Sequence, residues 1–310
     1  MKLNRIARAV LAAAAAAGLV VGVINPAHSA AKTTVSIVQS NALTGLNPSV
    51  QEYNLTFNTD VAYLSGIGFT YYNNQAQLVD NKAFGTYKIV SQKPFKVKYT
   101  VNPGRTWSDG TPINGIDLLL THVVSTAAYS VIAGLGDPND AKVTPAFLSG
   151  GYGGIYDEHV VGLPILSPDK MSVTVEYDTQ VPDWKLLAPG PTPVHTLVLM
   201  EEGKTKLGTI AENNAARERF YKYFQNYDTT HLKAIGKIWS EDYNINKVDA
   251  STNPLLLVGN GPFVVKTAVP NGAVTMVRNA KYNSGPKVKS LQTVVFKVIG
   301  DGTAAAQALK

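Results

Sequence analysis

Polar and apolar residues alternate along several short stretches of this chain, which is the pattern of half-buried β-strands. The clearest alternation runs over residues 95–101, where Phe95 and Val97 fall on one side and Lys96 and Lys98 on the other. Further strands are predicted over residues 33–40, 66–72, 87–92, 171–177, 263–267, 273–278 and 291–299. No repeat of fixed period is visible in the sequence, so a repeat architecture is not expected.

Helical periodicity and strong helix formers predict two helices in the second half of the chain, over residues 212–227 and 230–239. A shorter helix is predicted after Asn114, because Asp117 follows three residues later with the spacing of a capping box. Residues 302–310 begin another helical segment. Helices interleaved with meandering strands predict a mixed α/β fold rather than strict βαβ alternation.

The N-terminus has the order of a secretory signal peptide. Lys2, Arg5 and Arg8 precede an uncharged apolar run over residues 9–24, and a proline and several small residues follow. We therefore predict that residues 1–31 are a cleaved signal peptide. An uncleaved anchor is the alternative, although the run is shorter than the roughly 20 apolar residues of a membrane-spanning helix.

The amino-acid composition excludes several kinds of site and partner. The chain has no cysteine, which excludes disulfides, thiolate metal sites, a cysteine nucleophile and a lipidated cysteine after the signal. Loss of residues 1–31 removes three basic residues and no acidic one, so the net charge falls from +6 to +3. That small charge, without any basic run, gives no reason to expect a nucleic-acid partner.

One short block, WSDGTP at residues 107–112, stands out between the strand at 95–101 and the helix after Asn114. In a functional interpretation, Trp107 is a ligand platform and Asp109 an acid. In the structural interpretation, Trp107 fills a core and the Asp-Gly pair makes a turn. We favour the structural interpretation, because each of these residues already has a local role.

Catalytic and metal-binding patterns are not found. None of the five histidines belongs to a ligand set with metal-binding spacing, and no G-x-S-x-G sequence occurs. The glycines of GNGPF at residues 259–263 precede a predicted strand and not the helix N-terminus that would hold a phosphate. We therefore expect no metal, no cofactor and no enzyme, with an exported hydrolase as the less favoured alternative.

Several blocks, taken in order, resemble one known family. They are VSIVQ (35–39) with LNP (46–48), KYTV (98–101) with WSDGTP (107–112) and IDL (116–118), GNGPF (259–263), Arg278-Asn279 with Tyr282, and VVF (294–296). Together they resemble the extracellular solute-binding proteins of family 5, which serve oligopeptide and dipeptide ABC importers. In two respects the chain departs from the family: Asn283 stands where a tryptophan is usual, and the anchoring cysteine of many members is absent.

The resemblance implies a periplasmic-binding-protein-like type II fold (cluster C), of which only the first lobe is present. Family members are considerably longer than this chain. By the same resemblance, residues 32–60 and 190–300 form the core of lobe one and residues 61–189 its accessory subdomain. Residues 301–310 then begin a second lobe.

The resemblance also implies a function without catalysis. A protein of this kind is exported to the periplasm or the cell surface, captures di- or oligopeptides as a monomer, and delivers them to the permease subunits of an ABC importer. Oligosaccharides, nickel complexes and opines are alternative ligands for the same fold.

Site residues follow from the resemblance as well. It implies ligand contacts on one loop, at Leu46, Asn47 and Glu52, although a solvated surface carboxylate is the simpler explanation for Glu52. Structural roles are expected for Trp107, Asp109, Gly110, Pro112, Asp117, Gly261, Pro262, Asn279 and Tyr282.

Overall fold

The structure is a computed structural model that describes residues 33–308. The predicted signal peptide, residues 1–31, lies outside the described residues. Within the described part of the chain, no helix combines the length and the apolar character that crossing a bilayer requires.

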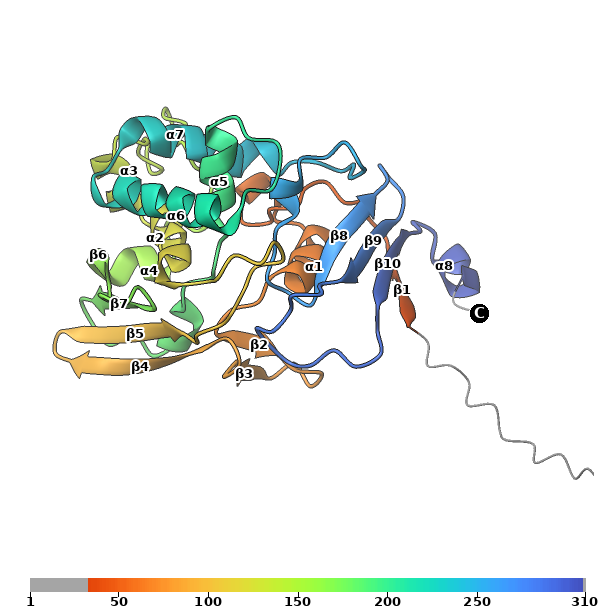
Figure 1. The fold of residues 1–310 in the computed structure, drawn as a ribbon, viewed down its shortest axis with the longest axis horizontal. Helices are drawn as coiled ribbons and strands as arrows, with labels where there is room; N and C mark the ends of the chain where they lie inside the picture. The colour runs from red at the N-terminus through yellow and green to blue at the C-terminus, as the bar shows by residue number, and fades with distance from the viewer. Residues whose placement is uncertain (1–32, 309–310) are drawn as a thin grey trace, which may run out of the picture. The chain divides into compact units, whose positions relative to one another are not determined.

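One four-stranded sheet joins the two ends of the described chain (Figure 1). Its strand order is β1 (Thr34–Gln39), β10 (Thr293–Val298), β9 (Val274–Arg278) and β8 (Phe263–Ala268). β1 and β10 run parallel, with Ile37 opposite Phe296, and the other neighbours are antiparallel. Helix α1 (Thr56–Ser65) packs on this sheet, where the rings of Phe57 and Phe296 are 5.2 Å apart. These contacts close a small core of their own.

A second four-stranded sheet is antiparallel throughout. It consists of β4 (Gly85–Gln92), β5 (Phe95–Val101), β7 (Ser172–Tyr177) and β6 (Val160–Leu166), in that order. Every odd position of β5 is buried and every even position is partly exposed, as its alternating sequence predicts. A small ribbon of β2 (Thr70–Tyr72) and β3 (Leu78–Asp80) makes up the third sheet.

Six helices share a larger core with the second sheet. They are α2 (Leu120–Ser125), α3 (Ala127–Ile132), α4 (Ile155–His159), α5 (Val194–Glu201), α6 (Ile210–Gln225) and α7 (Thr229–Lys237). Single turns lie at η1 (Gln51–Tyr53), η2 (Gly115–Leu118), η3 (Trp184–Leu187), η4 (Ile238–Asp242) and η5 (Pro254–Leu257), and α8 (Gly302–Ala308) follows β10.

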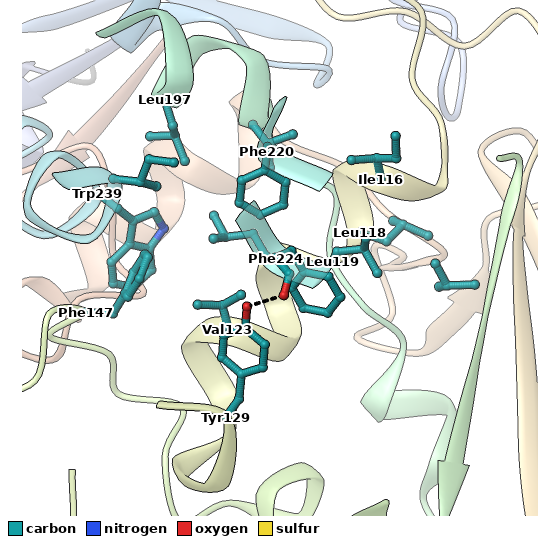
Figure 2. Close-up of a cluster of buried hydrophobic side chains, with 14 of the residues drawn as sticks. Ile116, Leu118, Leu119, Val123, Tyr129, Phe147, Leu197, Phe220, Phe224 and Trp239 are labelled. Carbon is teal, nitrogen blue, oxygen red and sulfur yellow. Dashed lines mark hydrogen bonds between the residues drawn. The ribbon is translucent and has the colours of Figure 1, made fainter. Parts of the chain in front are cut away.

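Figure 2 shows the centre of this larger core, where α2, α5 and α6 bring their apolar side chains together. The Tyr129 hydroxyl donates a 2.8 Å hydrogen bond to the carbonyl of Phe224, and the two rings stack 5.2 Å apart. A buried phenol needs such a partner, because an unpaired hydroxyl inside a core costs free energy.

Most of the predicted elements are confirmed, often to within two residues. The predicted strand at 66–72 is shorter in the structure and covers only Thr70–Tyr72. The Asn260 side chain explains this difference: it accepts a hydrogen bond from Ile67 N at 3.0 Å and donates one to Ile67 O at 2.8 Å. The backbone there is paired with a side chain and not with another strand.

The predicted division of the lobe stays a prediction. The sheet of β1, β10, β9 and β8 comes from the two segments predicted as the lobe core, and the sheet of β4 to β7 comes from the predicted accessory segment. Helices α5, α6 and α7, however, pack into the same hydrophobic cluster as the second sheet. The two predicted parts therefore share one core along this boundary.

Candidate ligand-binding groove

A groove of about 580 Å³, here called the main groove, lies where several distant segments meet. Its lining residues are Leu46, Asn47, Pro48, Ser49, Asn54, Leu120, Thr121, Val124, Ser125, Ser149, Gly150, Gly151, Gly190, Pro191, Thr192, Pro193, Trp239, Tyr243 and Val258. It has the size of a pocket for a small organic ligand.

The loop from Leu46 to Ser49 forms one wall, and backbone carbonyls hold it in place. Leu46 N donates to Tyr243 O at 2.8 Å, and the Asn47 side-chain amide donates to Trp239 O at 2.9 Å. The Asn47 side-chain oxygen also accepts from Ser49 N at 3.2 Å. Asn47 therefore fixes the loop against the turn that contains Trp239.

A second wall is the glycine-containing loop at residues 149–151, which pairs with the first wall much as two short strands would. Gly150 N donates to Ser49 O at 3.0 Å, and Gln51 N donates to Leu148 O at 2.9 Å. A Cβ atom on Gly151 would lie 2.9 Å from the Ser125 hydroxyl oxygen. Glycine at this position therefore lets the loop approach α2 closely.

The third wall combines α2 with the proline-rich segment at residues 190–193. The Thr121 hydroxyl donates to Gly190 O at 3.1 Å, and Thr192 N donates to Asp117 O at 2.8 Å. At Gly190, no atom lies within 4 Å of where a Cβ would be, so this position faces open space.

Two of the three predicted ligand contacts, Leu46 and Asn47, line the main groove. Glu52 does not line it. This residue is exposed in η1, between the lining residues Ser49 and Asn54. The ligand contacts predicted for all three residues stay a prediction.

The WSDGTP block folds into a turn around a buried aromatic residue. The Trp107 side chain is buried, with 1% of the residue exposed, and the Trp107 backbone N–H donates to Thr111 O at 2.9 Å. Gly110 has a φ of +92°, which an L-residue adopts only with strain, and Pro112 O accepts a hydrogen bond from Arg217.

Asp109 connects that turn to α5 and α6. One of its oxygens, Oδ1, accepts from Thr111 N at 2.9 Å, and the other, Oδ2, lies 2.9 Å from His195 Nε2. Asn213 donates to the same Oδ2 at 3.1 Å and to the Thr111 hydroxyl at 2.8 Å. Burial alone raises the pKa of Asp109, but His195 and Thr111 together lower the pKa below its ordinary value.

Asp117 completes the capping box and also forms an ion pair. Its Oδ2 accepts from Asn114 N at 3.0 Å and lies 3.1 Å from the Arg217 guanidinium. Burial raises the pKa of Asp117, and the charge of Arg217 opposes this shift without cancelling it. The ion pair therefore joins η2 to α6 inside the larger core.

Gly261, Pro262, Asn279 and Tyr282 lie at the far end of the first sheet. Asn279 donates its backbone N–H to Pro262 O at 2.9 Å and its side-chain amide to Gly261 O at 3.0 Å. Tyr282 N donates to Asn279 O at 3.1 Å, which closes a turn after β9.

Pro262 and Tyr282 also line a second groove of about 580 Å³, together with Tyr63, Tyr71 and Tyr72. Its lining is mostly apolar and aromatic, and burial raises the pKa of Tyr282 to about 12. Gly190 and Pro191 line both grooves, so this short segment separates the two.

Most of the main groove was not predictable from the sequence. Residues from α2, the 149–151 loop, the 190–193 segment and the η4 turn contribute to the lining, but none belongs to a block with a recognisable ligand-binding pattern. The available signals were the glycine-rich stretch SGGYGG and the proline-rich PGPTP. Each predicts a loop but not what the loop faces.

Within residues 33–308, no three His, Asp or Glu side chains gather closely enough to hold a metal ion. Two of the described histidines each lie beside a single carboxylate. His159 lies 3.0 Å from Asp178, and His231 lies 2.8 Å from Glu201.

The fold is shared with solved binding proteins. The periplasmic EDTA-binding protein EppA is 19% identical to this chain, with a TM-score of 0.60, over 89% of this chain and 41% of EppA. The oligopeptide-binding protein AppA from Bacillus subtilis, solved in complex with a nonapeptide, is 15% identical with a TM-score of 0.56, over 89% of this chain and 42% of AppA. NikZ from Campylobacter jejuni, solved with Ni(L-His), is 16% identical with a TM-score of 0.53, over 90% of this chain and 41% of NikZ.

These identities show the fold alone, and this chain spans about two fifths of the length of the solved proteins. No protein of curated function matches the chain in sequence. The model of the bacterial extracellular solute-binding proteins, family 5 (middle part), matches residues 86–310, which is more than half of the chain. This protein therefore belongs to the bacterial extracellular solute-binding proteins of family 5.

Proposed function

We propose that this chain is part of the extracytoplasmic solute-binding component of an ABC importer, and that it captures di- or oligopeptides for delivery to the membrane permease. The family match carries the proposal, because residues 86–310 include the walls of the main groove at α2, 149–151, 190–193 and η4. AppA, solved with a nonapeptide, has the same fold, so a peptide ligand is compatible with this fold.

In this proposal, the described residues form the first of two lobes, and the main groove holds one side of the ligand. The second lobe closes over the other side. Binding then shifts an open–closed equilibrium toward the closed state, which the permease recognises. The protein acts as a monomer that binds its ligand and does not cleave it, in keeping with a family of solute-binding proteins.

Glu52 is proposed to contact only ligands that extend beyond the main groove. Its exposed carboxylate lies beside the lining residues Ser49 and Asn54. From there it contacts a ligand that extends beyond the main groove. A Glu52→Gln variant then weakens the binding of long peptides and leaves the binding of short ones unchanged.

Ligand-induced thermal shift tests the proposal, because a ligand that binds only the folded state raises the melting temperature. The chain is heated with a panel of tri- to nonapeptides, with neutral oligosaccharides and with nickel–histidine. We expect only peptides to raise the melting temperature, and mass spectrometry to recover them uncleaved. A shift with sugar or nickel–histidine but not with peptides would replace the peptide by that ligand, and peptide cleavage would indicate a hydrolase.

A further inference from the structure

The lining of the main groove carries no formal charge. Among the described residues that line it, none is Asp, Glu, Lys, Arg or His. The polar side chains of its lining are those of Ser, Thr, Asn, Tyr and Trp residues. Burial raises the pKa of Tyr243 to about 12, so its phenol is neutral at physiological pH.

Charged residues next to the walls do not line the main groove. Glu241 and Asp242 precede the lining residue Tyr243, but both are exposed and outside the lining. Glu52 is likewise exposed outside it. Asp117 contributes only its carbonyl, to Thr192, while its carboxylate is buried against Arg217.

A charged ligand group that packed against these walls would lose part of its hydration and find no counter-charge on them. Burying an unpaired charge is far more costly than burying a polar group that finds a hydrogen-bond partner. Amide and hydroxyl groups of a ligand instead exchange bonds with water for bonds with the protein at little net cost. The walls therefore discriminate by charge.

Apolar side chains complete this environment. Leu46, Leu120, Val124 and Val258 lie between the polar groups of the lining. A peptide main chain with small or apolar side chains matches such a mixture, because its amides pair with the hydroxyls while its side chains cover the apolar patches.

We infer that the part of the ligand held by the main groove is an uncharged stretch of peptide, and that lysine, arginine, aspartate and glutamate side chains are excluded from it. The inference rests on the proposed function. It adds a substrate class to that function: peptides with a neutral segment.

Blocked tetrapeptides test the inference. Each is acetylated at its N-terminus and amidated at its C-terminus, and carries serine, lysine or aspartate at both central positions. Maltotetraose serves as a neutral sugar probe. Binding to the chain is followed by NMR titration, which also measures weak affinities. We expect the serine peptide to bind at least about tenfold more tightly than either charged peptide.

The outcomes separate the inference from the proposed function. A lysine or aspartate peptide that binds within threefold of the serine peptide overturns the inference and leaves peptide binding standing. Maltotetraose binding without any peptide binding overturns the peptide function, and with it the assignment of a neutral peptide segment. If no probe binds, both fail.

A variant that adds a charge to the main groove tests whether its lining causes the preference for uncharged peptides. Ser49 is an exposed lining residue, so S49K is compatible with the fold. We expect S49K to improve binding of the aspartate peptide about tenfold and to weaken binding of the lysine peptide. S290K, on an exposed serine outside the lining, is the matched control and should change neither. Equal effects of S49K and S290K would overturn the inference.

Discussion

The imidazole Nε2 of His195 lies 2.9 Å from Oδ2 of Asp109, and both side chains are almost completely shielded from solvent. This contact joins the WSDGTP turn to α5, one of the helices in the larger core. Since charge-assisted hydrogen bonds in a buried setting are the stronger ones, the pair should contribute measurably to stability.

We expect D109N to lower the free energy of unfolding by about 2 kcal/mol at pH 7, because the variant keeps the shape of Asp109 but loses its charge. Urea denaturation measures the difference. D178N is the matched control, since Asp178 also lies 3.0 Å from a histidine but is exposed. D178N should lower the free energy of unfolding by less than about 1 kcal/mol. Equal losses in the two variants would contradict the role given to the buried pair.

The pH dependence of the same variant follows from the lowered pKa of Asp109. The ionised carboxylate stabilises the folded protein above the unfolded-state pKa of about 3.9, and this contribution is lost as the pH falls through the lower folded pKa. The difference in stability between the wild type and D109N should therefore shrink below about pH 4. A difference that stays constant from pH 3 to pH 7 would show that the charge does not matter.

Arg217 and Arg219 provide a second matched pair on α6. R217M leaves the carboxylate of Asp117 buried without its partner, which should cost about 3–5 kcal/mol at pH 7. R219M removes only a partly exposed ion pair with Glu202, 2.7 Å long, and should cost less than about 1 kcal/mol. Thermal and urea denaturation compare the two variants.

Asp117 in R217M should respond to pH with the opposite sign to Asp109 in the wild type, because its folded pKa is raised and not lowered. Burial already raises the pKa of Asp117, and loss of Arg217 raises it further. An acid with a raised folded pKa destabilises the folded state as the pH rises from its unfolded pKa through its folded pKa. R217M should therefore be more stable at pH 5 than at pH 8. The double variant D117N/R217M should recover part of the loss at pH 8, and no recovery would contradict this explanation.

Gly261 is expected to be intolerant of any side chain. A Cβ at this position would lie 2.4 Å from Leu64 O and 2.5 Å from the carbonyl carbon of Ser65. G261A should therefore lower the free energy of unfolding by about 3 kcal/mol, since α1 and the start of β8 must move apart. G190A is the control, because Gly190 faces open space, and it should be neutral or slightly stabilising. Urea denaturation of both variants measures the two changes in the free energy of unfolding, and equal changes would contradict the close packing assigned to Gly261.

Gly190 also allows the main groove to be blocked without harming the fold. A tryptophan there meets no atom at its Cβ and takes up groove volume, so G190W should weaken peptide binding more than tenfold while the melting temperature stays unchanged. G302W places the same side chain at a glycine that faces open space outside the lining. NMR titration of both variants measures peptide binding. Unchanged binding by G190W would show that the ligand does not bind in the main groove.

Helix α5 shows why parts of the fold escaped prediction. All six residues from Val194 to Leu199 are buried, including the polar His195 and Thr196, so no solvent-exposed polar face gives the segment a helical period. Its sequence therefore resembles a short apolar run of undecided type. The capping box at Asn114 and Asp117 was recognisable, because both partners lie within four residues of each other.

The candidate site was predictable only at one edge. Leu46 and Asn47, for which ligand contacts stay a prediction, line the main groove, but the Asn47 amide bonds to Trp239, far along the chain. Nothing in the local sequence around Ser125 or Gly190 indicates that these residues face the same space. Convergence of distant segments depends on packing, which a local pattern does not encode.

The amino-acid sequence alone determined what depends on neighbouring residues: the alternating strands, the capped helix starts, the Asp-Gly turn at Gly110, the absence of cysteine chemistry and the family. The tertiary structure decided what depends on contacts across the chain: the parallel pairing of β1 with β10, the burial of His195 against Asp109 and the uncharged walls of the main groove. The physical reason is that periodicity and capping act over a few residues, whereas pairing and groove formation require the whole core to pack first.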